Sequence, residues 1–163
     1  MELTKALSIT NRLVELLSPS CEKINVAGSC RRGKPDVKDI ELVALPKNIV
    51  LKDIFGWDEG IIREPMFEKT INGFGKIVKG NADGKMMQIE LPEGIMLDLF
   101  IPDAFDYYRQ FAIRTGSADY SWKVIASGWK KIGFCGTENG LRLIDECEAK
   151  KDKDGKIIKS TAR

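Results

Sequence analysis

One segment, residues 95–101, constrains the fold of this chain more than any other. It reads Ile-Met-Leu-Asp-Leu-Phe-Ile, an apolar run that a single carboxylate, Asp98, interrupts. A short apolar run closed by Pro102 predicts a central strand of a sheet. An ionised carboxylate buried there without a partner costs several kcal/mol. The fold must therefore supply a compensating partner for Asp98.

A second strand is predicted over residues 39–43, where polar and apolar side chains alternate. Side chains two residues apart in a strand point to the same face, so Asp39 and Glu41 share one face. Adjacent carboxylates repel each other unless a cation lies between them, and oxygen ligands at this density suit Mg²⁺ or Mn²⁺. With Asp98 as the third ligand, the sequence predicts a three-carboxylate site for two metal ions.

A phosphate-binding turn is predicted just before this strand. A strand over residues 23–27 leads into Gly28 and Ser29. Glycine permits a sharp turn because it has no Cβ. Ser29 then offers a hydroxyl and backbone N–H groups where a helical turn begins, which is an arrangement that binds phosphate. Arg31 and Arg32 add guanidinium groups suited to bidentate phosphate contacts.

Each of these features alone has an ordinary structural explanation. An Asp-x-Glu pair commonly lies on a solvated strand edge, and a lone aspartate in an apolar strand can pair with a core arginine. Their order and spacing along one chain make the combination specific.

The other elements indicate an α+β fold, because helical and strand periodicities are mixed along the chain. The expected elements are helices over 2–17, 50–55, 102–111 and 117–131, antiparallel strands within 58–94 (most clearly 85–91), short strands near the C-terminus, and a charged hairpin tip or loop over 150–156.

Composition excludes several kinds of chemistry. The 163 residues include no histidine, which rules out catalytic triads and general bases built on imidazole. The four cysteines form no C-x-x-C pattern, so we expect reduced thiols that pack in the interior rather than a zinc site. No signal sequence or bilayer-spanning run is found, which favours a cytoplasmic protein without a membrane partner.

The charge is unevenly distributed along the chain. Residues 1–108 hold 14 Lys/Arg against 17 Asp/Glu, whereas residues 109–163 hold 12 against 7. A basic region beside an acidic one suits a protein that holds a polyanion next to a metal site. An ordinary solvated surface would explain the same numbers.

Three motifs together resemble the nucleotidyltransferases of DNA polymerase family X, the polymerase β-like enzymes. The first is Gly-Ser-Cys-Arg-Arg-Gly followed by the acidic-x-acidic strand, which spans residues 28–41. The second is residues 96–100, which are similar to the strand that bears the family's third metal carboxylate. The third is Thr115-Gly116-Ser117, similar to the turn before the helix that contacts the nascent base pair.

The resemblance implies a fold and an activity. The fold would be a nucleotidyltransferase palm over residues 1–108, with a mixed or antiparallel sheet and helices on one face, followed by a small α/β C-terminal subdomain over 109–163. The activity would be DNA-directed DNA polymerisation at gaps or nicks, with Mg²⁺ or Mn²⁺ as cofactor and dNTPs and primer-template DNA as partners. The protein would be a monomer. It would act at the nucleoid or, if it is viral, in the cytoplasm of the host cell.

The resemblance also implies roles for individual residues. The metal ions would be held by Asp39, Glu41 and Asp98, and Asp98 would accept the proton of the primer 3′-hydroxyl. The incoming nucleotide would be contacted by Gly28, Ser29, Arg32, Thr115, Gly116, Ser117 and Ser121.

The chain departs from the family pattern at two places. Glu41 stands where aspartate is commoner, which extends that ligand by one C–C bond of about 1.5 Å. Ile113 and Arg114 stand where relatives often carry an aromatic pair that excludes ribonucleotides. We therefore expect weaker discrimination against ribonucleotides, with the charged head of Arg114 directed to phosphate or solvent.

Two other interpretations remain open at this point. One is nucleotidyl transfer to RNA, protein or a small molecule instead of a DNA primer. The other is a non-catalytic palm that binds DNA or a partner, although such a module would not require all three carboxylates.

Overall fold

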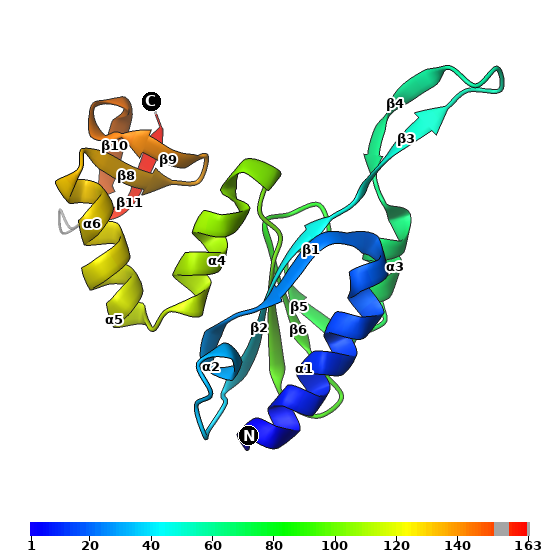
Figure 1. The fold of residues 1–163 in the computed structure, drawn as a ribbon, viewed down its shortest axis with the longest axis horizontal. Helices are drawn as coiled ribbons and strands as arrows, with labels where there is room; N and C mark the ends of the chain where they lie inside the picture. The colour runs from blue at the N-terminus through cyan, green and yellow to red at the C-terminus, as the bar shows by residue number, and fades with distance from the viewer. Residues whose placement is uncertain (152–156, 163) are drawn as a thin grey trace. The chain divides into compact units, whose positions relative to one another are not determined.

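The computed structural model describes residues 1–151 and 157–162. The chain divides into two compact units, Met1–Thr115 and Gly116–Arg163, which are described separately below (Figure 1). The predicted division lay at residue 108. Helix α4 (Tyr107–Thr115) accounts for the difference, because its buried Tyr107 packs against the sheet of the first unit.

A mixed five-stranded sheet forms the centre of the first unit, in the order β1-β2-β7-β6-β5. Only β2 and β7 run parallel, and every other neighbouring pair in this sheet is antiparallel. The apolar segment around Asp98 forms β7, the middle strand, as the sequence predicts. The α+β class is therefore confirmed. The strands are β1 (Cys21–Val26), β2 (Asp39–Pro46), β5 (Lys76–Lys79), β6 (Met86–Glu90) and β7 (Met96–Phe100).

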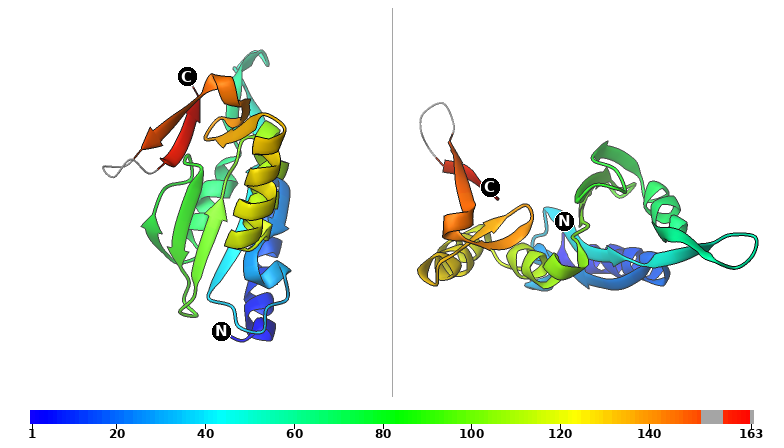
Figure 2. Two further views of the ribbon diagram at one scale, coloured as in Figure 1. Left: turned by 90° about the vertical axis from the view of Figure 1, so that its left-hand side faces the viewer. Right: turned by 90° about the horizontal axis from the view of Figure 1, so that it is seen from above.

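Two helices cover one face of this sheet. They are α1 (Leu3–Leu17) and α3 (Pro65–Asn72), and α1 lies along the strands in Figures 1 and 2. Alternate residues of the strands supply the other half of the core. The main core residues are Ala6, Ile9, Leu13, Leu17, Ile40, Leu42, Phe67, Ile71, Met87, Ile89, Leu97 and Leu99.

The opposite face is only partly covered. Helix α4 buries Tyr107 there with Val43 and Phe100, and Phe111 packs at the edge of this cluster. The Tyr107 hydroxyl donates to the Val43 carbonyl at 3.2 Å and accepts from the Asn25 amide at 3.0 Å. Helices therefore lie on both faces rather than on one, because α4 returns across the sheet after β7.

Two elements of the first unit differ from the sequence-based expectation. The helix expected over 50–55 is wrong: β3 (Asn48–Lys52) and β4 (Asp58–Arg63) form an antiparallel hairpin that extends from the unit (Figure 1). A short apolar run does not by itself separate helix from strand. Conversely, α3 lies within the stretch expected to hold strands, because Phe67 and Ile71 are buried at helical spacing after Pro65.

The second unit combines a helical segment with short strands, as predicted. The helical segment comprises α5 (Ala118–Tyr120), the π-helical η3 (Ser121–Ala126) and α6 (Ser127–Lys131). The strands pair as β8 (Phe134–Thr137) with β9 (Gly140–Leu143) and β10 (Cys147–Lys151) with β11 (Ile157–Ala162). Most of the tip expected at 150–156 lies outside the described residues. Shorter turns are α2 (Gly28–Arg31), η1 (Ser18–Ser20), η2 (Ala104–Asp106) and η4 (Ile144–Glu146).

The expectation of four reduced cysteines is corrected by the structure. Cys135 and Cys147 form a disulfide in the second unit, while Cys21 and Cys30 are free and buried. The β8–β9 hairpin and the η4 turn return the chain past β8, which brings two cysteines twelve residues apart into contact. Within the described residues, none of the helices has the length and apolar character needed to cross a membrane.

Candidate functional site

The three predicted carboxylates lie on the same face of two adjacent strands. Glu41 of β2 and Asp98 of β7 are direct partners in the parallel register, and Asp39 lies two residues before Glu41. Their apolar neighbours Ile40 and Leu97 point into the core beneath α1 and α3. Alternation along each strand therefore places the carboxylates on the face that α4 only partly covers.

Gly28 fits tightly against the Glu41 carboxylate. The Ala27 N–H donates to the Glu41 carbonyl at 2.9 Å, which fixes the turn beside β2. Gly28 has a φ of +58°, and a Cβ built there would lie 1.6 Å from Glu41 Oε2. Both the backbone conformation and the space require glycine at this position. The glycine of the predicted turn thus leaves room for the longer side chain of Glu41.

The rest of the turn presents polar groups to the same region. The Ser29 hydroxyl oxygen is buried, and no hydrogen-bond partner for it occurs in the described part of the chain. A buried hydroxyl of this kind ordinarily finds a partner, so Ser29 is suited to bind a ligand oxygen. Arg32 donates from Nη1 to the carbonyl of Thr115 at 2.6 Å, which joins the turn to the end of α4.

The site has an excess of negative charge. Burial and the neighbouring charges of Asp39 and Asp98 raise the pKa of Glu41 from 4.5 to about 7, and Arg114 and Arg32 oppose this shift. Burial also raises the pKa of Asp98. Like charges in a partly desolvated site disfavour ionisation of one another. A cation bound among these carboxylates would relieve the repulsion.

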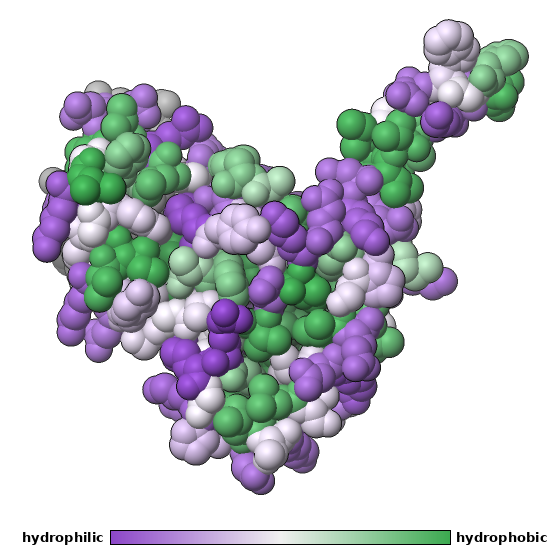
Figure 3. All heavy atoms as spheres, in the orientation of Figure 1, coloured by the Kyte–Doolittle hydropathy of each residue, from purple (hydrophilic) through white to green (hydrophobic). Residues whose placement is uncertain are grey.

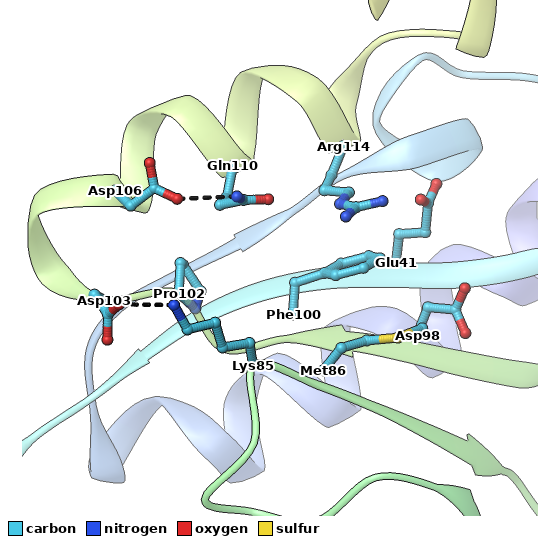
Figure 4. Close-up of a pocket in the computed structure, with 10 residues that line it drawn as sticks. All are labelled: Glu41, Lys85, Met86, Asp98, Phe100, Pro102, Asp103, Asp106, Gln110 and Arg114. Carbon is cyan, nitrogen blue, oxygen red and sulfur yellow. Dashed lines mark hydrogen bonds and ion pairs between the residues drawn. The ribbon is translucent and has the colours of Figure 1, made fainter. Parts of the chain in front are cut away.

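The charged head of Arg114, which was expected to reach phosphate or solvent, lies at the site. Its guanidinium lies over the Phe100 ring, 4.0 Å from the centroid, and Figure 4 shows it beside Glu41. Burial lowers the pKa of Arg114, while the charges of Glu41 and Asp98 act to raise it. The side chain is therefore directed to the carboxylates, not to solvent. Its spacing from Tyr107, seven residues along one helix, would have placed it on the sheet-facing side.

Gln88 of β6 is a second site residue, and it was not predicted from the sequence. It is the register partner of Asp98 in the antiparallel β6–β7 pair. Its amide Nε2 donates to Asp98 Oδ1 at 3.0 Å, which opposes the rise in the pKa of Asp98. The strand expected over 85–91 contained this signal, since Gln88 is the polar residue between two buried ones.

A pocket of about 300 Å³ opens between α4 and the partly covered face (Figure 4). Glu41 and Asp98 lie at one end, and the ion pair of Lys85 and Asp103, at 3.2 Å, lies at the other. The lining residues are Glu41, Lys85, Met86, Asp98, Phe100, Pro102, Asp103, Asp106, Gln110 and Arg114.

The remaining predicted nucleotide contacts are divided between the two units. Thr115 ends α4 in the first unit, where its hydroxyl is buried without a partner among the described residues. Gly116, Ser117 and Ser121 belong to the second unit. The Ser117 hydroxyl caps α5 by accepting from the Tyr120 N–H at 3.2 Å, and the Ser117 carbonyl accepts from the Ser121 N–H. These three residues form one local turn.

The donor set fits a hard divalent cation, although the side chains do not converge on one point. Within residues 1–151 and 157–162, no three His, Cys, Asp or Glu side chains are grouped closely enough to hold a metal ion as they stand. Glu41 turns its carboxylate toward Gly28, and Gln88 holds one oxygen of Asp98. Oxygen-only donors, carboxylate charge that Arg114 and Arg32 offset only in part, and a Ser29 hydroxyl without a partner in the described part of the chain nevertheless match what Mg²⁺ with a phosphate ligand requires.

The chain was also compared with known proteins. Its sequence matches none of the protein-family models and none of the curated proteins searched.

Proposed function

We propose that this protein is a nucleotidyltransferase that extends a DNA primer, in the manner of the family X polymerases that its motifs resemble. The observation that carries the proposal is the grouping of Asp39, Glu41 and Asp98 on one face of β2 and β7, against the Gly28 turn. Half-buried carboxylates side by side disfavour each other's ionisation, and a bound cation relieves this repulsion. The adjacent turn supplies the groups that a triphosphate needs.

Asp39, Glu41 and Asp98 would hold Mg²⁺ or Mn²⁺. Bound divalent ions stabilise the charge that develops when a hydroxyl displaces pyrophosphate from a nucleoside triphosphate. In that reaction the primer 3′-oxygen bonds to the α-phosphorus, the bond to the β-phosphate oxygen breaks, and the hydroxyl proton must leave.

Asp98 is the proposed acceptor of that proton. Gln88 occupies Oδ1, so Oδ2 is the oxygen available to the 3′-hydroxyl. Burial raises the pKa of Asp98 in the metal-free protein, and a cation bound to the carboxylate would act in the opposite direction. Ser29 and Arg32 would orient the triphosphate, the first through its hydroxyl and the second through its guanidinium.

The direct test is extension of a gapped primer-template with Mg²⁺ and each dNTP in turn. We expect incorporation of the nucleotide complementary to the template base. If incorporation does not depend on the template base, the protein is not a template-directed polymerase, and the proposal changes to a different kind of nucleotidyltransferase. An absence of transfer to DNA, RNA, protein and small-molecule acceptors would reject catalysis and favour the non-catalytic palm.

A further inference from the structure

The tip of the β3–β4 hairpin carries the most exposed apolar side chains of the described first unit. We call residues 53–59 (Asp-Ile-Phe-Gly-Trp-Asp-Glu) the acidic tip. Ile54, Phe55 and Trp57 are 93%, 79% and 75% exposed. Figure 3 shows hydrophobic spheres at the end of this projecting hairpin beside pale and hydrophilic ones. Three large apolar residues within four positions form a patch rather than scattered surface residues.

The acidic tip is held in one conformation by its own hydrogen bonds. Asp53 Oδ1 accepts from the N–H groups of Phe55 and Trp57 at 2.9 and 2.8 Å. The Gly56 N–H donates to the Asp53 carbonyl, and the Asp53 N–H donates to the Trp57 carbonyl. The aromatic side chains therefore project from an ordered turn. Such preorganised aromatic anchors lose little entropy when they enter a partner's surface.

The charge of the acidic tip restricts what it can bind. It contains Asp53, Asp58 and Glu59 and no basic residue, although Lys52 just before it lies 4.0 Å from Asp58. Phosphate backbones and anionic lipid surfaces would be repelled by three carboxylates. Two acidic tips would also repel each other, which argues against a symmetric tip-to-tip contact. A complementary surface must be both apolar and basic.

The second unit of the same chain carries such a surface. We call residues 120–132 the basic segment: it holds three lysines and no acidic residue. Trp122 and Ile132 are 74% and 68% exposed there, and Tyr120 and Val124 are also exposed. Lys123 pairs with Asp119 at 3.3 Å, an exposed contact that contributes little. The basic segment therefore resembles the acidic tip in its exposed apolar side chains and is opposite to it in charge.

We propose that the acidic tip of one molecule docks on the basic segment of a second copy of this chain. The two surfaces differ, so the contact is head-to-tail and leaves a tip and a segment unused at the ends of every assembly. Such contacts build open chains unless the rotation closes a ring. The patch is small compared with stable protein interfaces, so the association is weak and depends on concentration. It departs from the monomer that the sequence predicts.

The first measurement is sedimentation equilibrium of the full chain between about 5 and about 500 μM, which brackets the affinities of small interfaces. The weight-average mass should rise continuously above that of one chain. The double variant Phe55→Ser, Trp57→Ser should stay monomeric throughout. Ile61→Ser is the matched control, because Ile61 is an exposed apolar residue of the same hairpin outside the tip. It should associate like the wild type.

The decisive measurement mixes two variants that are each defective at one surface. The Phe55→Ser, Trp57→Ser protein keeps its basic segment, and a Trp122→Ser, Lys130→Glu protein keeps its acidic tip. Neither should self-associate, but an equimolar mixture should form a dimer and nothing larger, since only one complementary pair of surfaces remains. If the second variant does not fold, the charge pair Lys130→Glu, Lys131→Glu replaces it, and Asp58→Lys, Glu59→Lys should restore association to that protein.

Three results would overturn the proposal. The wild type could remain monomeric over the whole range. The tip variant could associate normally and lose affinity for gapped DNA, which would make the tip a DNA wedge. The wild type, but not the tip variant, could bind vesicles of phosphatidylcholine and phosphatidylserine without self-associating, which would make the tip a lipid contact.

Discussion

The two faces of the central sheet are built from the same strands and have opposite characters. On β7, Leu97 and Leu99 are buried beneath α1 and α3, while Asp98 between them faces the pocket under α4. On β2, Ile40 faces the core and Glu41 faces the pocket. One face stabilises the fold by burying apolar surface, and the other carries partly desolvated carboxylates, which are costly to keep ionised. The buried residues of the first face therefore fix where the strands place the carboxylates of the second.

Replacement of Asp98 should show most clearly that the charged face can be changed without loss of stability. Asp98→Asn keeps the shape and the Gln88 contact but removes the charge and the proton acceptor. We expect primer extension to fall by about 1000-fold or more, with the unfolding transition retained. Asp103→Asn is the matched control, because Asp103 lines the far end of the same pocket. A folded Asp98→Asn protein with most of the original activity would remove the proposed role of this residue.

Replacement of a residue on the apolar face should lower stability and not activity. Leu97→Ala, one residue away, deletes a fully buried side chain from the core. We expect the free energy of unfolding to fall by about 2–5 kcal/mol, measured by urea denaturation. Extension per folded molecule should stay within a few-fold of the original. A much larger loss at low temperature, where the protein remains folded, would mean that the two faces are not independent.

The turn at Gly28 joins the two faces, and a pair of glycine variants can test it. Gly28→Ala puts an alanine at a positive φ and places its methyl group against Glu41. Gly33→Ala also puts an alanine at a positive φ, +67°, but its methyl group meets no atom within 4 Å. Both variants should lose about 1–3 kcal/mol of stability from the backbone conformation. Only Gly28→Ala should lose extension activity, by about 100-fold, because it displaces a carboxylate. Equal activities of the two variants would show that Glu41 moves away without consequence.

Sequence periodicity predicted the strands of this site but not the groups that cross it. Alternation over 39–43 and the carboxylate in 95–101 located Asp39, Glu41 and Asp98, because strand geometry alone decides which side chains share a face. The spacing of Arg114 and the alternation around Gln88 give the faces on which they lie, but their partners depend on how α4 and β6 pack against β7, which is a tertiary property. Likewise, local apolarity could not distinguish the β3–β4 hairpin from a helix, and spacing alone could not pair Cys135 with Cys147.

Replacement of Arg32 should have a smaller effect, and it should weaken the binding of the nucleoside triphosphate more than the binding of DNA. Arg32→Ala removes a guanidinium beside Ser29 and its bond to the Thr115 carbonyl. We expect nucleotide affinity to fall by about 10-fold and gapped-DNA affinity to change less, with both measured by titration. Arg31→Ala is the control, because Arg31 lies in the same turn but stacks over the Phe111 ring at 4.7 Å. A large loss of DNA affinity with unchanged nucleotide affinity would reverse the assignment of Arg32.

The charged face should also make stability depend on pH. In the folded protein the pKa of Glu41 is raised from 4.5 to about 7, so between these values the folded state holds a proton that the unfolded chain has lost. Raising the pH through this window should therefore lower the free energy of unfolding of the metal-free protein. The Glu41→Gln variant cannot ionise at this position, so its stability should fall less over the same range, as urea denaturation in EDTA would measure.

Saturating Mg²⁺ should restore the stability of the wild type near the upper end of the window and leave that of the variant nearly unchanged, because a bound cation replaces the proton. If both proteins lose the same stability without metal, the repulsion among these carboxylates is relieved by another group, and the electrostatic contrast between the two faces is weaker than we infer.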